Sequence, residues 1–260
     1  MKLLIKLGGA LLDSVESRAR IASEIAEVAR EYETVVVHGG GKQLTRFLEA
    51  QGIQSNFVNG LRVSDAHVID GVVKVLAGTV NKGLVSALIA AGGRPLGISG
   101  VDGLLTQAVQ LAPGLQFVGK PISTDGHLID LLVKSGYLPV VACLACDDSG
   151  AIYNVNADQM AVSCATGWAA DKLLFLTDVP GVKIATGEVA SHLTVAQMLE
   201  LVCSGVAYGG MQAKLEAAVA ALQSIGEVVI APGDQPNICR RVLNRDNIGT
   251  RLSLKSEVPA

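Results

Sequence analysis

The sequence predicts an α/β protein built around a mostly parallel sheet. Short aliphatic and β-branched runs alternate along the chain with segments whose apolar residues recur at helical spacing. Such alternation favours right-handed crossovers between parallel strands. The composition agrees, because half of the residues are apolar, 17% are charged and aromatic residues are few. At 260 residues the chain can bury a full core, as one large domain or two closely fused lobes.

The periodicity and the turn residues place the elements in order. Strands are expected at 3–7, 34–37, 95–99, 138–142, 172–176 and 227–231, and helices at 15–30, from 42, at 68–89, 125–134 and 159–168, and from 209. The stretches 53–63 and 101–123 are expected to form hairpin-like structures, and a short helix and the segment 248–252 close the chain. The helix over 68–89 is apolar on too many sides for a surface helix, so we expect it in the core or at a subunit interface.

The strand at 34–37 opens into the sequence HGGGK at 38–42. Glycines let a ligand approach bare N–H groups, and the following helix directs its positive dipole end to the same place. An anion site is therefore expected here, with a glycine-rich turn that binds nothing as the alternative. Spacing excludes a P-loop, which would need glycine at Val36 and Ser or Thr at Gln43, and the dinucleotide fingerprint, which would need glycine at Leu44.

Two basic residues stand beside other glycine turns. Lys6 lies inside the first apolar strand, just before Gly8 and Gly9, and a lysine there is costly to bury unless it meets an anion. A ligand role is favoured over a charge that guards an edge strand. Arg62 follows Gly60 and suits bidentate binding of a carboxylate, although an ordinary surface arginine fits the local sequence equally well.

The second half of the chain has its own polar cluster, YNVNAD at 153–158. Asn156 could cap the next helix and Asp158 could be its first-turn acid, which the local sequence favours. Lys214 is expected in the first turn of the helix that begins near residue 209, where its charge opposes the helix dipole and needs a compensating anion. Asp178 follows a strand at its carboxyl end, where ligands of open α/β sheets bind.

Composition limits the other function classes. The five cysteines (143, 146, 164, 203 and 239) are odd in number, lack zinc spacing and are interpreted as small buried hydrophobes in a reducing compartment. Cys143 and Cys146 have redox spacing, but no helix pattern follows them, so a redox role is disfavoured. The net charge of −3 without a basic cluster argues against nucleic acid. With no signal peptide and no uninterrupted apolar stretch near the ~18 residues of a membrane span, a cytoplasmic protein is expected.

Together these motifs resemble the acetylglutamate branch of the amino acid kinase family. They are KLGG at 6–9, HGGG at 38–41, GLRV at 60–63, VNK at 80–82, YNVNAD at 153–158, LTDVPGV at 176–182 and GGM at 209–211 with Lys214. The resemblance runs in register from Lys6 to residues 248–250. GLRV and YNVNAD indicate the acetylglutamate branch, whereas Lys6, HGGG and TDVPGV are shared across related kinases.

The resemblance implies a three-layer α/β/α sandwich forming a single domain over 1–260, with an amino-acid lobe at about 1–170 and an ATP lobe at about 171–260. It implies ATP-dependent phosphorylation of the γ-carboxylate of N-acetyl-L-glutamate in arginine biosynthesis, with Mg²⁺ held mainly by the ATP phosphates. Lys6 and Lys214 would stabilise the transferring phosphoryl group, and Asp158 would orient both lysines. The substrate would be held by Gly40, Gly41, Arg62 and Asn154. The nucleotide would be held by Gly8, Gly9, Asp178, Val179, Gly181, Lys183, Gly209 and Gly210.

The expected chemistry needs no general base, because a carboxylate acceptor is already an anionic nucleophile. His38 is therefore interpreted as a structural hydrogen-bonding residue. Two alternatives stay open. One is a kinase for carrier-linked glutamate or aminoadipate, disfavoured because no basic run lies near Arg62. The other is a non-catalytic amino-acid sensor on the same fold, disfavoured because Lys6, Asp158 and Lys214 are all present.

The resemblance also bears on assembly. Lys6 lies six residues from the start of the sequence, so the chain is expected to lack the N-terminal helical extension by which arginine-inhibited hexamers of the family join their dimers. The broad apolar helix over 68–89 is the favoured two-fold contact. We therefore expect a homodimer that is insensitive to arginine.

Overall fold

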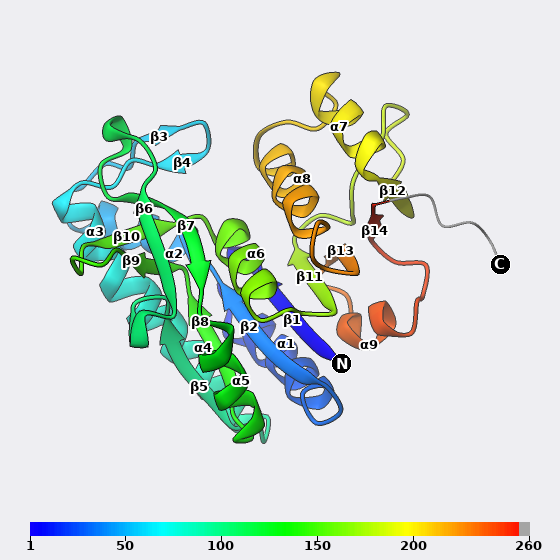
Figure 1. The fold of residues 1–260 in the computed structure, drawn as a ribbon, viewed down its shortest axis with the longest axis horizontal. Coiled ribbons are helices and arrows are strands. Elements are labelled where there is room, and N and C mark those ends of the chain that lie inside the picture. The colour runs from blue at the N-terminus through cyan, green and yellow to red at the C-terminus, as the bar shows by residue number, and fades with distance from the viewer. Residues whose placement is uncertain (255–260) are drawn as a thin grey trace.

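The computed structural model describes residues 1–254 and has an eight-stranded sheet at its centre (Figure 1). Its strands lie in the order β12-β14-β13-β11-β1-β2-β8-β5, and all neighbours are parallel except β13 and β14. The strands are β1 (Lys2–Leu7), β2 (Glu33–His38), β5 (Pro95–Ser99), β8 (Leu138–Ala142), β11 (Lys172–Thr177), β12 (His192–Thr194), β13 (Glu227–Pro232) and β14 (Thr250–Ser253). The predicted mostly parallel sheet is confirmed.

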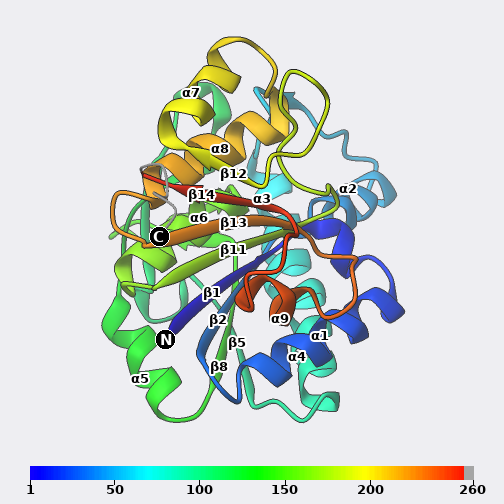
Figure 2. The ribbon, with the colours of Figure 1, turned by 90° about the vertical axis from the view of Figure 1, so that its right-hand side faces the viewer.

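Helices cover both faces of this sheet, which gives the three-layer α/β/α sandwich that was expected (Figure 2). On one face α1 packs against α4 and α9, and on the other α6 packs against α8, which also contacts α7. The helices are α1 (Val15–Val28), α2 (Gly41–Ala50), α3 (Ala66–Val72), α4 (Asn81–Ala90), α5 (Gly126–Lys134), α6 (Ala157–Gly167), α7 (Val195–Cys203), α8 (Gly209–Ala221) and α9 (Ile238–Leu243). Short 3₁₀ turns lie at Gly9–Leu12, Asp102–Leu104 and Pro113–Leu115.

A smaller closed sheet lies beside the N-terminal half of the main one (Figure 1). It consists of β6 (Thr106–Gln110), β7 (Val118–Thr124), β9 (Leu144–Cys146) and β10 (Ile152–Val155). β6 and β7 are antiparallel, as the hairpin predicted within 101–123 requires. The other predicted hairpin is formed by β3 (Phe57–Val58) and β4 (Leu61–Arg62), whose connecting residues Asn59 and Gly60 have φ angles of 49° and 77°. Glycine and asparagine tolerate this left-handed region better than other residues.

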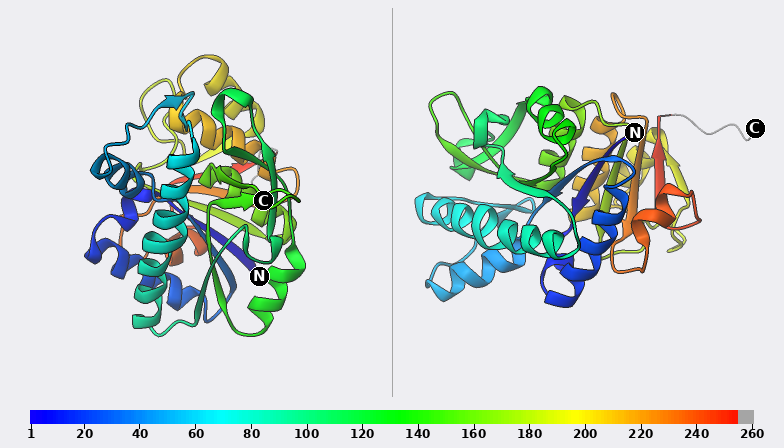
Figure 3. Two further views of the ribbon diagram at one scale, coloured as in Figure 1. Left: turned by 90° about the vertical axis from the view of Figure 1, so that its left-hand side faces the viewer. Right: turned by 90° about the horizontal axis from the view of Figure 1, so that it is seen from below.

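The long helical segment Ala66–Ala90, which Figure 3 shows as a continuous coil, is not a regular α-helix throughout. Residues Val73–Val80 are π-helical, whereas periodicity predicted a single regular helix. The segment buries Val72, Leu76 and Leu88 but leaves Val73 and Ile89 37% and 59% exposed. By length and composition alone this segment is apolar enough to cross a membrane, a criterion that a core helix also meets. Charged residues at 70, 74 and 82 interrupt it, so it is not an uninterrupted apolar stretch of the kind considered in the sequence analysis.

The cysteine prediction holds for four of the five residues. Cys143, Cys146, Cys164 and Cys239 are buried free thiols, and burial raises the pKa of the Cys143 thiol to about 11. Cys203, the last residue of α7, is exposed, so its interpretation as a buried hydrophobe was wrong. It lies on the outward side of a helix that buries Met198 and Leu201.

Candidate active site

Two glycine turns meet at the carboxyl edge of the main sheet. β1 and β2 are parallel neighbours, so the turns that follow them leave the sheet on the same side. A methyl group added to Gly9 would lie 3.5 Å from the Gly41 amide nitrogen and 3.7 Å from that of Gly40. The space in front of these two nitrogens is therefore free only because residue 9 has no side chain. Backbone N–H groups around such a space form a cradle for an anion, at the start of α2.

Gly40 is also required for packing. A methyl group there would lie 2.7 Å from Cδ2 of Leu76 and 2.9 Å from Cγ2 of Val80, both in the π-helical segment. The segment thus lies directly against the turn. This contact explains why glycine is needed at 40 independently of any ligand. It also shows that the π-helical part of the long helix lies beside the cradle, as π-helical turns often do at functional sites.

Three charged side chains lie close together next to this cradle. Lys6 Nζ is 2.6 Å from Oδ1 of Asp158, and Lys214 Nζ is 2.8 Å from Oδ2. The three residues are only 7–8% exposed. Two ammonium groups and one carboxylate leave one positive charge without a partner in the trio, and a buried charge needs an anion. Lys6 lies on β1 between β2 and β11, so the alternative of an edge-strand charge was wrong.

The two lysines also decide the protonation of the carboxyl group between them. Burial by itself would raise the pKa of Asp158, but the positive charges of Lys6 and Lys214 outweigh it and hold the pKa at about 2. Burial, together with the neighbouring charge of Lys6, lowers the pKa of Lys214. At neutral pH Asp158 is therefore an anion that keeps both ammonium groups in place.

Local sequence and tertiary structure each account for part of the α6 terminus. Asn156 caps the helix, since its Oδ1 accepts hydrogen bonds from the backbone N–H groups of Asp158 and Gln159 at 2.9 and 3.2 Å. Asp158 is also the first-turn acid, as the local interpretation had it. Lys214 was placed wrongly: α8 begins at Gly209, so Lys214 lies in its second turn, where the dipole is weaker. The charge that Lys214 contacts directly is the carboxylate of Asp158, not the N-terminus of α8.

Arg62 is buried, so the alternative of an ordinary surface arginine was wrong. It is 8% exposed, and its guanidinium donates to Oγ of Ser55, to Oγ1 of Thr45 at 2.7 Å and to the Gly41 carbonyl at 3.3 Å. Its Cζ lies 4.6 Å from the ring centroid of Phe57. Within residues 1–254 no carboxylate comes within ion-pair distance of this guanidinium, whose pKa is lowered by burial. Its charge can be neutralised by a carboxylate ligand near Gly41.

Asn154 is connected to Arg62 through Ser64. Nδ2 of Asn154 donates to Oγ of Ser64 at 3.1 Å, and that hydroxyl donates to the Arg62 carbonyl at 2.9 Å. The structure therefore connects Asn154 and Arg62 on the same side of the site. Sequence reasoning did not identify the supporting hydroxyls of Thr45, Ser55 and Ser64, because nothing in their local sequence distinguishes them from ordinary polar residues.

The residues predicted to hold a nucleotide are less closely grouped. Asp178 lines a pocket of about 590 Å³ at the carboxyl ends of β11 and β13. Gly209 and Gly210 are not among the residues that line this pocket. Gly8 donates its N–H to the Leu176 carbonyl at 2.8 Å, which holds its turn to β11. Glycine is needed at 181 for packing, since a methyl group there would lie 2.7 Å from Oγ1 of Thr250.

The rest of the predicted nucleotide set lies at the surface. Lys183 is exposed and Val179 is partly exposed, while Gly209 and Gly210 are exposed at the start of α8. In the part of the chain from 1 to 254, no three His, Cys, Asp or Glu side chains are grouped so as to hold a metal ion.

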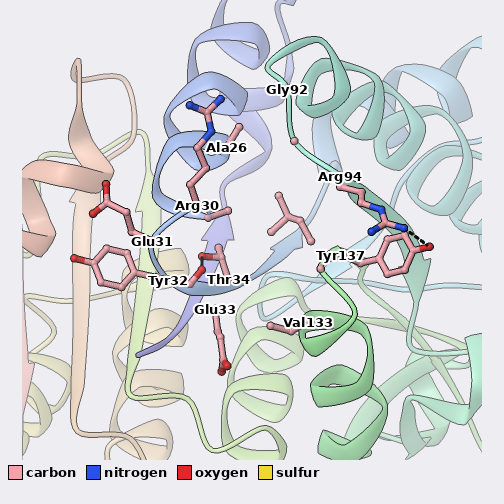
Figure 4. A pocket seen from close by; sticks show the side chains of 14 residues that line it. Ala26, Arg30, Glu31, Tyr32, Glu33, Thr34, Gly92, Arg94, Val133 and Tyr137 are labelled. Carbon is pink, nitrogen blue, oxygen red and sulfur yellow. Dashed lines mark hydrogen bonds between the residues drawn. The ribbon is translucent and has the colours of Figure 1, made fainter.

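Two other hollows are lined by neither lysine of the trio. The one in Figure 4, of about 360 Å³, is at the opposite edge of the sheet, where Arg94 stacks 4.2 Å from the Tyr137 ring centroid and donates to its hydroxyl. A groove of about 780 Å³ runs between β7, α6 and α8 and is lined by Lys120 and Asn156 among others. Neither is lined by Lys6, Asp158, Lys214 or Arg62.

Comparison with known proteins agrees with this geometry. Residues 1–232 match the sequence profile of the amino acid kinase family. The chain is 50% identical over 254 residues to the acetylglutamate kinase of Solibacter usitatus, covering 97% of this chain and 99% of that one. It is 42% identical over 247 residues to the acetylglutamate kinase of Acidobacterium capsulatum, covering 92% of this chain and 95% of that one.

Solved structures show the same fold at lower identity. An N-acetylglutamate synthase from Neisseria gonorrhoeae, in complex with coenzyme A and N-acetyl-glutamate, superposes with a TM-score of 0.87 at 24% identity, over 98% of this chain and 59% of that one. A carbamate kinase from Giardia superposes with a TM-score of 0.71 at 18% identity, over 97% of this chain and 98% of that one.

Proposed function

Because this chain belongs to the amino acid kinase family, we propose that it transfers the γ-phosphoryl group of ATP to the γ-carboxylate of N-acetyl-L-glutamate, in arginine biosynthesis. The observation that carries the proposal is the buried trio Lys6–Asp158–Lys214, which has one more positive than negative charge, beside the backbone cradle at Gly40 and Gly41. Relatives named acetylglutamate kinase, at up to 50% identity over nearly the whole chain, support the substrate.

The reaction forms one bond and breaks one. An oxygen of the acceptor carboxylate forms a bond to the γ-phosphorus, and the bond from that phosphorus to the β,γ-bridging oxygen breaks, so that the electron pair leaves with ADP. No proton has to be removed from the acceptor. What the protein must supply is alignment and positive charge.

The lysines supply that charge. Each ammonium group is fixed by one oxygen of Asp158, so neither has to be reoriented when negative charge moves from the acceptor towards the leaving group. The Gly40 and Gly41 amides complete the positive surroundings. Nucleotide-bound Mg²⁺ supplies further charge neutralisation when present, and we place it mainly on the phosphates.

The acceptor is held by Arg62 and Asn154. The buried guanidinium beside the Gly41 carbonyl pairs with the α-carboxylate, and the amide of Asn154, linked to Arg62 through Ser64, holds a polar group of the same ligand. ATP is expected along residues 178–183 and at the start of α8. Asp178 is close enough to Lys214 on α8 to oppose the lowering of the lysine pKa. The two segments are therefore near each other, which supports this placement.

We further propose a cytoplasmic homodimer joined through the long helix. Val73 and Ile89 are exposed apolar residues on this helix, whose most apolar 18-residue stretch is only 39% buried. A second copy of the chain can cover them. A monomer mass by light scattering, together with unchanged behaviour of Ile89→Lys, would contradict this contact.

The test of the function is ADP release by the purified chain with ATP, Mg²⁺ and a panel of acceptors. We expect turnover with N-acetyl-L-glutamate and much lower turnover with glutamate and aspartate, and Lys6→Met should abolish it. Turnover only with a carrier-linked glutamate or aminoadipate would identify the alternative kinase. Ligand binding without any turnover would favour the amino-acid sensor.

A further inference from the structure

A buried hydrogen-bonded chain lies behind the glycine cradle. His38, the last residue of β2, is fully buried, and its Nδ1 lies 2.8 Å from the Gly39 carbonyl. Its Nε2 lies 3.0 Å from Nδ2 of Asn81, the first residue of α4, which is also fully buried. The chain therefore runs from the long helix through an imidazole to the backbone of the turn.

The direction of each hydrogen bond in this chain is determined by its neighbours. Nδ2 of Asn81 also donates to the Val140 carbonyl at 2.9 Å, and Oδ1 of Asn81 accepts from Lys82 Nζ at 3.0 Å, so the amide cannot be turned over. Because Nδ2 can only donate, Nε2 of His38 is the acceptor and Nδ1 carries the hydrogen. His38 consequently donates Nδ1–H to the Gly39 carbonyl.

A fixed carbonyl at Gly39 also fixes the next N–H. The Gly39 carbonyl and the Gly40 N–H belong to one planar trans peptide unit and point in opposite directions. With the carbonyl held by His38, the Gly40 N–H points away from the imidazole, and its nitrogen is 3.7 Å from the place where a Gly9 methyl would stand. A peptide between two glycines has little conformational restraint of its own.

We infer that His38 and Asn81 are positioning residues that hold the Gly39–Gly40 peptide so that the Gly40 N–H is directed at the anion in the cradle. This inference rests on the proposed function, because it assigns the anion to the phosphoryl transfer. Burial, the largest effect, lowers the pKa of His38 to about 4, as does the charge of Lys82 to a smaller extent. The imidazole thus stays neutral and keeps the lone pair that Asn81 requires.

The test compares two substitutions that differ mainly in the donor. Asn at position 38 places an amide nitrogen where Nδ1 stood and can still donate to Gly39, whereas Leu has a similar shape and cannot. Since one preorganised donor is worth about 10²–10³ in turnover, and a misdirected one is partly retained, His38→Leu should lose at least ~10-fold in kcat/KM for acetylglutamate. His38→Asn should stay within ~3-fold of wild type, and KM for ATP should change less than twofold in both.

Asn81→Leu removes the other end of the chain and should lose activity between these limits, which keeps the inference testable if His38→Leu does not fold. Thr106→Val is the matched control, because it removes a buried 3.0 Å hydrogen bond to Thr124 in the small sheet. It should lower the melting temperature while leaving kcat/KM unchanged.

The outcomes separate the two proposals. Equal kcat/KM values for His38→Asn and His38→Leu in an active wild-type background would overturn the positioning role alone, and so would wild-type activity in Asn81→Leu. A wild-type chain that shows no acetylglutamate-dependent ADP release would overturn the proposed function, and with it this inference.

Discussion

Replacing Asp158 by asparagine tests the centre of the site. As a first-turn acid alone, the carboxylate would contribute about 0.3–1 kcal/mol to stability. The structure predicts more, because the pKa lowered from 3.8 to about 2 corresponds to about 2 kcal/mol at ~1.4 kcal/mol per unit. Removal also leaves the buried ammonium groups of Lys6 and Lys214 without their shared anion, so the total loss should approach the ~3–5 kcal/mol of a broken buried pair.

Turnover should fall as well, on the order of a hundredfold or more, because two charges lose their fixed positions at once. The melting temperature and kcat therefore both decrease, and stability alone does not separate a structural from a catalytic role. Nucleotide phosphates can replace the missing carboxylate next to the lysines. Saturating Mg-ATP should consequently raise the melting temperature of Asp158→Asn more than that of wild type.

The control is Asp130→Asn on α5. Asp130 also joins two lysines, Lys2 at 2.9 Å and Lys134 at 3.1 Å, and accepts a hydrogen bond from Trp168, but it is far from the glycine cradle. It should lose stability while keeping kcat. Near-normal kcat in Asp158→Asn, or an equal kcat loss in Asp130→Asn, would refute the reasoning.

Three further substitutions give separate tests. Arg62→Ala should raise KM for acetylglutamate more than it lowers kcat, since its carboxylate contact exists in both ground and transition states; an unchanged KM would remove Arg62 from the site. Gly9→Ala should keep the melting temperature within ~2 °C, since its methyl meets only ordinary contacts of 3.5 and 3.7 Å, yet lower kcat/KM at least ~10-fold by filling the cradle; full activity would exclude an anion there. His38→Asn should remove the part of the pH dependence of stability that comes from the His38 imidazole. The folded pKa of about 4 lies below the unfolded 6.5, so His38 contributes stability above pH 6.5 that is lost as the pH falls to 4, about 3 kcal/mol in all. Urea unfolding of wild type and His38→Asn at several pH values between 4 and 6.5 measures the free energy of unfolding of each. If both free energies change equally with pH, the assignment is contradicted.

Much of the fold follows from local patterns. β8 occupies the predicted residues 138–142, and β2 extends the predicted strand 34–37 by one residue at each end, because a buried parallel strand is a continuous apolar run. The glycine turns, the β3–β4 hairpin and the Asn156 cap were also predictable, since each depends on conformational preferences within a few residues.

The chemistry of the site depends on distances that no local pattern contains. Lys214 and Asp158 are 56 residues apart in the chain and become partners only because α6 and α8 pack on the same face of the sheet. Lys6 shares the same carboxylate because β1 lies under that layer, next to β11. Sequence reasoning reached this trio through resemblance, whereas its own local arguments favoured a first-turn acid for Asp158 behind the Asn156 cap.

The sequence by itself determined the order of strands and helices, the glycine turns and the types of residue that handle an anion, because propensity, periodicity and turn chemistry act over short range. Only the tertiary structure decided that Arg62 is buried with no carboxylate of residues 1–254 at ion-pair distance, that the 73–80 segment is π-helical against Gly40, and that Asn81 reaches His38. Each of these depends on which distant surfaces the topology brings together, and on the burial that makes an unpaired charge or a fixed hydrogen bond energetically important.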